Sequence, residues 1–246
     1  MQPIIQQNRP PRLHIEPGFA WDGQDAYLFD IDGTLLRCNF PIHMGSILSS
    51  VFQATGYEVS LSGVPIDGNT DTGILREACR QAEIPAEILE PRFEAILESM
   101  RRAVASERHR MAPVRMPGVE ETLIHLTQKG ALLGLATGNL EEIGWIKVEE
   151  AGLRNWFRFG GFSDKFPLRT ELIGQAARKA REMAGAAARV CVVGDTPRDI
   201  AAARANSLPV IAVASGGYSF DALLEHQPEV CASSLADLLA QSQVAP

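Results

Sequence analysis

The sequence lacks the features that mark membrane, secreted or redox proteins. No apolar run approaches the ~20 residues that a helix needs to cross a bilayer, and the N-terminal stretch has no apolar centre of the kind found in signal peptides. The 246 residues include four cysteines but no CxxC pair, so neither a zinc site nor a dithiol motif is expected. These absences favour a protein of the reducing cytoplasm.

Positive charge is also scarce. Lysine and arginine number 23 against 30 aspartates and glutamates, which gives a net charge of −7. Nucleic acids require a basic surface, so we expect neither nucleic acid nor membrane as a partner. A small anionic ligand in a local positive pocket remains compatible with this balance. The sequence does not indicate an oligomeric state.

Short apolar runs alternate with helical patterns along much of the chain. The runs predict buried strands at residues 26–29, 131–136, 189–193, 209–214 and, more weakly, 158–162. Helical spacing and N-terminal acidic residues predict helices at residues 117–129, 141–151, 170–184 and 199–205. This alternation predicts an α/β fold, with a Rossmann-like, doubly wound parallel sheet.

Residues 38–112 differ, because they contain no convincing strand. Helices are expected at 44–55 and 72–83, and an apolar stripe from Leu89 to Val104 predicts one long helix. We therefore expect an all-helical cap inserted after the first strand. The predicted domains are a loosely ordered, proline-containing lead-in at 1–24, a core at 25–37 and 113–246, and the cap at 38–112.

Polar residues follow three of the predicted strands. Asp30 and Asp32 end the first, the segment 137–139 ends the second, and Asp195 and Asp199 follow the third. Ligands of open parallel sheets bind beyond the carboxyl ends of the strands, so we expect four carboxylates at one edge. Such a cluster repels itself unless a cation compensates it. Mg²⁺, which prefers oxygen ligands, is the expected cofactor.

Three motifs carry a family resemblance. The segments "DIDGTLL" (30–36), "ATGN" (136–139) and "GDTPRDI" (194–200) resemble the first, second and fourth motifs of the haloacid dehalogenase-like (HAD) superfamily in identity, order and spacing. The similarity extends over about residues 26–220. The helical insertion, with "DGNTDTGILREA" at 67–78, resembles the cap of the phosphoglycolate-phosphatase-like branch.

The resemblance implies a hydrolase that works through a covalent intermediate. Asp30 would be the nucleophile that forms an aspartyl-phosphate. Asp32 would protonate the leaving oxygen and then activate water, while its backbone carbonyl binds Mg²⁺ together with Asp30. Asp195 would be a further metal ligand, and Asp199 either a ligand or a residue that orients one.

Phosphate binding is implied for the second and third motifs. Thr137 and the amides of Gly138 and Asn139 would hold phosphate oxygens. The third motif departs from the family pattern, in which a lysine precedes a proline-containing turn. Within "SDKFPLRTELIGQAARKA" (163–180), Arg169 is the preferred cation to screen nucleophile and phosphate, and Lys165 is the alternative.

Several reactions are compatible with such a site. The presence of Asp32 argues against dehalogenation, and the absence of lysine from the insertion argues against phosphonate cleavage. Hydrolysis of a small phosphomonoester is the leading hypothesis. A sugar phosphomutase of the β-phosphoglucomutase type stays open if Arg76 or Arg80 covers the site, and a non-catalytic ligand-binding module is the other alternative. The cap is expected to close over the site on hinges at 38–40 and 111–113.

Overall fold

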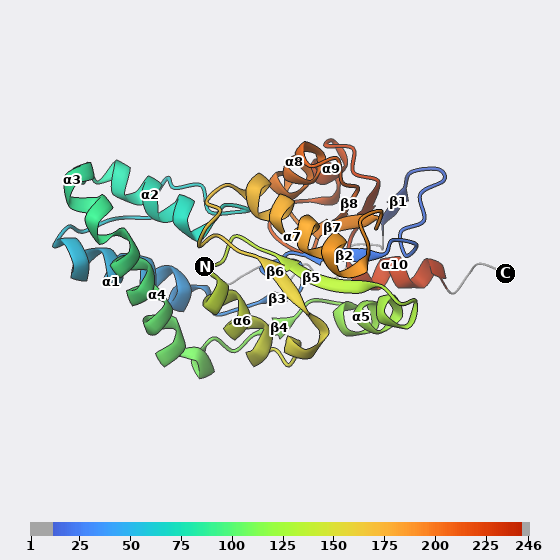
Figure 1. Ribbon diagram of the computed structural model, residues 1–246, viewed down its shortest axis with the longest axis horizontal. Helices are drawn as coiled ribbons and strands as arrows, with labels where there is room; N and C mark the ends of the chain where they lie inside the picture. The colour runs from blue at the N-terminus through green and yellow to red at the C-terminus, as the bar shows by residue number, and fades with distance from the viewer. Residues whose placement is uncertain (1–11, 243–246) are drawn as a thin grey trace.

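A seven-stranded sheet forms the centre of the molecule (Figure 1). The computed structural model describes residues 12–242. The strand order is β1-β9-β8-β7-β2-β5-β6, and β1 is antiparallel to its neighbour while the other pairs are parallel. The strands of this sheet are β1 (Leu13–Ile15), β2 (Ala26–Phe29), β5 (Leu132–Ala136), β6 (Phe159–Gly161), β7 (Val190–Gly194), β8 (Val210–Val213) and β9 (Val230–Ala232).

The order of the strands reverses at β2. From β2 the chain adds β5 and β6 on one side, then crosses to β7 and adds β8 and β9 on the other. The carboxyl ends of β2, β5 and β7 therefore lie side by side at the point where open α/β sheets bind ligands. The predicted fold class is confirmed, and all five predicted strands are present.

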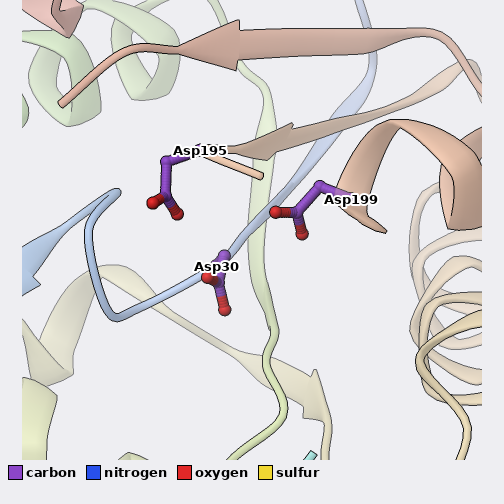
Figure 2. A group of neighbouring side chains, drawn as sticks. All are labelled: Asp30, Asp195 and Asp199. Carbon is purple, nitrogen blue, oxygen red and sulfur yellow. The ribbon is translucent and has the colours of Figure 1, made fainter. Parts of the chain in front are cut away.

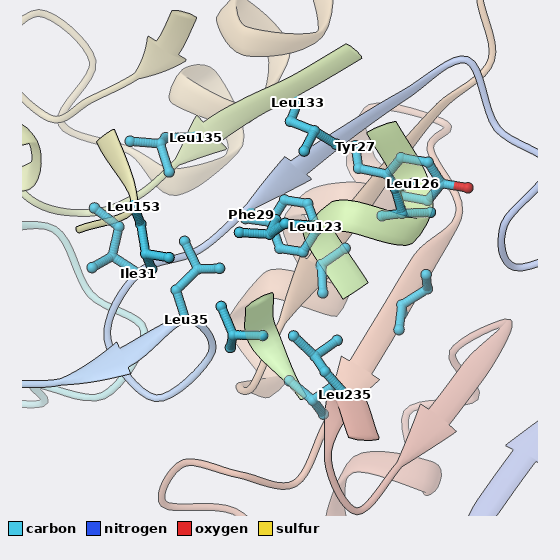
Figure 3. Packing of buried hydrophobic residues seen from close by; sticks show 14 of the residues in the cluster. Tyr27, Phe29, Ile31, Leu35, Leu123, Leu126, Leu133, Leu135, Leu153 and Leu235 are labelled. Carbon is cyan, nitrogen blue, oxygen red and sulfur yellow. The ribbon is translucent and has the colours of Figure 1, made fainter. Parts of the chain in front are cut away.

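Both faces of the sheet are buried, as the continuous apolar runs predicted. Tyr27 and Phe29 join a cluster with α5 and α10 on one face (Figure 3), whereas Ala26 and Leu28 join a cluster with α7, α8 and α9 on the other. The helices of the core are α5 (Val119–Gln128), α6 (Glu141–Glu150), α7 (Arg169–Ala184), α8 (Pro197–Ala205), α9 (Phe220–Leu224) and α10 (Leu235–Ser242), with a short 3₁₀ turn η3 (Arg154–Trp156). None of the helices within residues 12–242 has the length and apolarity needed to cross a membrane.

The N-terminal lead-in is more ordered than expected. The part of it that the structure describes contains β1, whose Leu13 and Ile15 pair with Ala232 and Val230 of β9, and Trp21, which is buried against the core. The expectation of a loose segment is wrong for these residues because backbone pairing at the sheet edge and one large aromatic side chain hold them. Residues 1–11 lie outside the described part of the chain.

The sequence patterns also missed several short strands. β9 has three residues, and β3 (Leu36–Arg37) and β4 (Val114–Arg115) have two each. Such short segments show no alternation that a sequence window can detect. β3 and β4 pair antiparallel and join the helical insertion to the core.

The insertion is a helical cap that lies at the opposite end of the molecule from α10 (Figure 1). Its helices are α1 (Phe40–Thr55), α2 (Asp71–Gln81), α3 (Ala86–Leu89) and α4 (Phe93–Ser106), with 3₁₀ turns η1 (Glu90–Arg92) and η2 (Arg108–Arg110). The predicted long helix is present but begins at Phe93 rather than at Leu89, because Pro91 places the 3₁₀ turn η1 before the regular α-helix. The apolar stripe nevertheless packs as expected, since Ile96, Leu97, Met100 and Val104 are all buried in the cap.

The hydrophobic core of the cap continues into the main domain. Leu140, Ile143 and Ile146, at the start of α6 and within it, belong to the same buried cluster as α1, α2 and α4. At the junction, the amide of Asn39 donates to the carbonyl of Met111 at 2.8 Å. The cap is thus packed directly against the helix that follows the second motif.

Candidate active site

Three buried carboxylates meet at the carboxyl edge of the sheet (Figure 2). Asp30 follows β2, Asp195 follows β7, and Asp199 lies in the first turn of α8. Oxygen atoms of the three lie within 4.8 Å of one another, and the residues are 5%, 3% and 0% exposed. The parallel pairing of β2 with β7 brings together residues that are far apart in the chain.

The surroundings of this acidic cluster disfavour negative charge. Burial raises the pKa of Asp30 to about 6; the charge of Arg169 opposes this rise, and those of Asp199 and Asp32 add to it. Burial and the charges of Asp30 and Asp199 raise the pKa of Asp195 well above its usual value. A cation bound here would relieve both effects, and buried carboxylate oxygens are the donors that suit a hard divalent ion. The donor set therefore fits Mg²⁺.

Two glycines allow the neighbouring loops to enclose Asp195. A Cβ atom would lie 2.3 Å from its Oδ2 at Gly33 and 1.7 Å from it at Gly216, so no other residue fits either position without movement. Gly33 also has a φ of +88°, which glycine adopts readily. The hydroxyl of Thr34 donates to Oδ1 of Asp195 at 3.1 Å. These contacts hold the carboxylate at the edge of the cavity.

Arg169 is the cation that the structure places against the acidic cluster. Its Nη2 lies 3.0 Å from Oδ1 of Asp30, and its Nε donates to Oδ1 of Asp199 at 2.8 Å. Burial alone would lower the pKa of Arg169, but the charges of Asp199 and Asp30 outweigh it and raise that pKa. Lys165, the alternative at the sequence level, is exposed and does not line the cavity.

Asp199 uses both carboxylate oxygens within the protein. While Oδ1 accepts from Arg169, Oδ2 accepts from the amide and hydroxyl of Thr196 at 3.0 and 2.7 Å. Thr196 and Asp199 form a capping box at the start of α8. Asp199 therefore both caps this helix and orients Arg169.

Asp32 lies apart from the other three carboxylates. It shares the predicted edge of the sheet with them but stays outside their group, because its Oδ2 is held by Nζ of Lys147 at 2.6 Å and by Nδ2 of Asn139 at 2.9 Å. Burial acts to raise the pKa of Asp32, but the charge of Lys147 outweighs it and lowers that pKa. Asp30 and Asp32 still line the same cavity.

The sequence reasoning missed Lys147. It is 2% exposed in α6, and burial would lower its pKa, yet the charge of Asp32 raises it. One signal was available: Lys147 lies four residues after Ile143, so it shares a helix face with an apolar residue. A lysine on an apolar face requires a buried acidic partner.

A cavity of about 90 Å³ separates this edge of the sheet from the cap. The core side includes all of the predicted site residues except Lys165 and Asp199. The cap side includes His43, Met44, Ile66, Asp67, Asn69, Asp71 and Ile74. The space suits a small ligand with one polar, anionic end.

The cap touches the second motif directly. The amide of Asp71 donates to the carbonyl of Gly138 at 2.7 Å, and a Cβ on Gly138 would lie 2.1 Å from the carbonyl oxygen of Asn69. Thr70 caps α2, since its hydroxyl accepts from the amide of Gly73 at 3.0 Å. Only a glycine at position 138 permits this close approach between cap and core.

The two cap arginines that a phosphomutase could use form ion pairs within the cap. Arg76 pairs with Glu90 at 2.6 Å and stacks on Phe93, and Arg80 pairs with Glu77 at 2.7 Å. Neither arginine lines the cavity. The phosphomutase alternative required one of them to cover the site, so it is not favoured.

Solved structures share this architecture. A predicted phosphoglycolate phosphatase from Haemophilus somnus superposes with a TM-score of 0.61 at 20% identity, covering 89% of this chain and 98% of the other. CbbY from Rhodobacter sphaeroides, in complex with phosphate, gives 0.59 at 17% identity, covering 79% of this chain and 87% of the other. At these identities the likeness defines a shared α/β fold.

Sequence comparison then identifies the family. A family model described as haloacid dehalogenase-like hydrolase matches residues 24–206. A curated phosphoglycolate phosphatase from Agrobacterium fabrum is 27% identical over 219 residues, which cover 86% of this chain and 89% of the relative. The chain belongs to the haloacid dehalogenase-like hydrolases, as the three motifs predicted.

Proposed function

We propose that this chain is a Mg²⁺-dependent phosphatase that hydrolyses a small phosphomonoester through an aspartyl-phosphate on Asp30. The observation that carries the proposal is the position of Asp30, which is buried at the end of the central strand between Arg169 and Asp195. The relative from Agrobacterium fabrum is named a phosphoglycolate phosphatase, so phosphoglycolate is the first substrate to test.

In the first half-reaction, a carboxylate oxygen of Asp30 attacks phosphorus and the bond to the leaving oxygen breaks. The negative charge of a bound phosphate raises the pKa of Asp32 above its lowered value in the free protein. Asp32, from the same cavity, then transfers a proton to the leaving oxygen, so the product leaves as an alcohol. Arg169 balances negative charge beside Asp30. The hydroxyl of Thr137 and the backbone at 138–139 hold the remaining phosphate oxygens.

In the second half-reaction, water attacks the phosphorus of the aspartyl-phosphate. Asp32, now ionised, accepts a proton from that water, and the bond between Asp30 and phosphorus breaks to release inorganic phosphate. Asp30, Asp195 and the backbone carbonyl of Asp32 would hold Mg²⁺, with Asp199 acting through Arg169. When bound, the ion neutralises charge on the phosphoryl group.

A phosphate-release assay tests the proposal. Phosphoglycolate, glycerol 3-phosphate and p-nitrophenyl phosphate are each offered with Mg²⁺ or with EDTA, and Asp30→Asn serves as the inactive control. Release that requires both Mg²⁺ and Asp30 is the expected result. Silence of the wild-type protein towards all three esters in Mg²⁺ favours the non-catalytic binding module instead.

The cap is proposed to span residues 38–112 and to move on hinges at 38–40 and 111–113. Cap closure would exclude water from the first half-reaction. Crystals with and without a phosphate mimic test this, and identical cap positions argue against it. The four free cysteines agree with the proposed cytoplasmic location.

A further inference from the structure

Lys147 donates to three side chains around the proposed acid. Its Nζ lies 2.6 Å from Oδ2 of Asp32, 2.7 Å from Oδ1 of Asn139 and 3.1 Å from Nδ1 of His43. An ammonium group has three N–H donors and no acceptor. All three donors of Lys147 are therefore used within the protein.

The contact with Lys147 determines which ring nitrogen of His43 carries the proton. Because Lys147 only donates, Nδ1 of His43 accepts and the proton of the neutral ring lies on Nε2. Nε2 is 3.0 Å from Oδ2 of Asp71, to which it donates. The same oxygen of Asp71 accepts from the amide of Leu140 at 2.8 Å.

This hydrogen-bonded chain crosses between the two parts of the molecule. His43 and Asp71 belong to cap helices α1 and α2, whereas Lys147 and Asp32 belong to the core. His43, Asp71 and Lys147 are each at most 3% exposed. Only a cap seated on the core completes the set of partners around Lys147.

The bonding pattern leaves one oxygen of Asp32 for chemistry. Lys147 and Asn139 both engage Oδ2, and within residues 12–242 Oδ1 of Asp32 accepts no hydrogen bond. The Asp32 side chain is 40% exposed and lines the cavity. The pattern suits a carboxyl group that is held through one oxygen and reacts through the other.

We propose that Lys147 is a positioning residue that orients Asp32 when His43 and Asp71 bring the cap into place. The inference rests on the proposed phosphatase function, because it assigns Lys147 a role through the general acid. A competing role for Lys147 is to bind a carboxylate group of the substrate. That role is disfavoured because the three donors are already used and the cap adds Asp67 and Asp71 to the same cavity.

The test compares two leaving groups. p-Nitrophenolate is a stable anion that departs without a proton, whereas an alkoxide requires one from Asp32. The value of kcat/KM is measured because it reports the first half-reaction alone. General acid catalysis contributes about 10²–10⁴-fold, so Lys147→Met is expected to lose about 100-fold or more on glycerol 3-phosphate but less than about 10-fold on p-nitrophenyl phosphate.

A second pair of variants tests the contribution of the cap. His43→Ala is expected to show the same selective loss on glycerol 3-phosphate, though a smaller one. His43→Gln is expected to restore part of it, because a glutamine amide can accept from Lys147 and donate to Asp71. These variants keep the inference testable if Lys147→Met does not fold. Lys129→Met, which removes a surface ion pair with Asp22, is the matched control.

Two results overturn the inference. Equal losses on both esters in Lys147→Met and His43→Ala indicate a purely structural role. A loss confined to phosphoglycolate, with glycerol 3-phosphate unchanged, indicates that Lys147 binds the substrate carboxylate. Inactivity of the wild-type protein on every ester is a different outcome, because it refutes the phosphatase function itself.

Discussion

Asp30 and Asp32 are two residues apart, yet their surroundings act on them in opposite directions. The pKa of Asp30 is raised to about 6, whereas that of Asp32 is lowered. Replacing each by asparagine removes the negative charge with little change in size. We expect Asp30→Asn to stabilise the metal-free protein and Asp32→Asn to destabilise it at pH 7.5.

The magnitude for Asp30 follows from linkage. One pKa unit corresponds to about 1.4 kcal/mol, so a rise from 3.8 to about 6 costs the folded state roughly 3 kcal/mol once Asp30 is ionised. The pKa of Asp30 is higher in the folded protein than in the unfolded chain. The contribution of protonated Asp30 to the free energy of unfolding is therefore complete at pH values below the pKa of the unfolded chain. It is lost as the pH rises through the folded value. The advantage of Asp30→Asn should therefore grow between about pH 4 and 6 and stay constant above.

Urea unfolding in EDTA, followed by tryptophan fluorescence, measures the free energy of unfolding of both variants. Asp32→Asn is the matched comparison, because it leaves the buried ammonium of Lys147 without its anionic partner. Asp30→Asn should also abolish turnover. An Asp30→Asn protein that is no more stable than wild type at pH 7.5 would show that the acidic cluster is already compensated without a metal ion.

Three further predictions follow from the same site. Arg169→Met should lower kcat/KM by about 100-fold or more, with Lys165→Met near normal; the reverse result would transfer the third-motif role to Lys165. Gly138→Ala should destabilise the seated cap by about 1–3 kcal/mol and raise KM, because its methyl group would meet the carbonyl of Asn69; unchanged KM and melting temperature would argue against tight docking. Mg²⁺ binding should release protons and tighten from pH 5 to 7, since the raised pKa of Asp30 must fall; calorimetry in two buffers of different ionisation enthalpy measures this, and an absence of proton release would contradict it.

Much of the fold could be predicted because its signals are local. The strand "AYLF" at 26–29 is apolar throughout, as expected of a strand that is covered on both faces. The strands β1, β3, β4 and β9 escaped prediction because two or three residues carry no period, and their pairing depends on distant partners, as that of β1 depends on β9. Pro91 was visible in the sequence, but the apolar stripe around it masked the break between α3 and α4.

The sequence by itself determined which groups end the central strands, because the aspartates, Thr137 and the glycines follow apolar runs whose carboxyl ends must share one edge of a parallel sheet. Only the tertiary structure decided which basic side chain pairs with each of these aspartates. It put Arg169 against Asp30, and Lys147 between Asp32 and His43. The physical reason is that the pairing of buried charges depends on distances of a few ångströms between helices that are remote in sequence, and helical periodicity does not encode those distances.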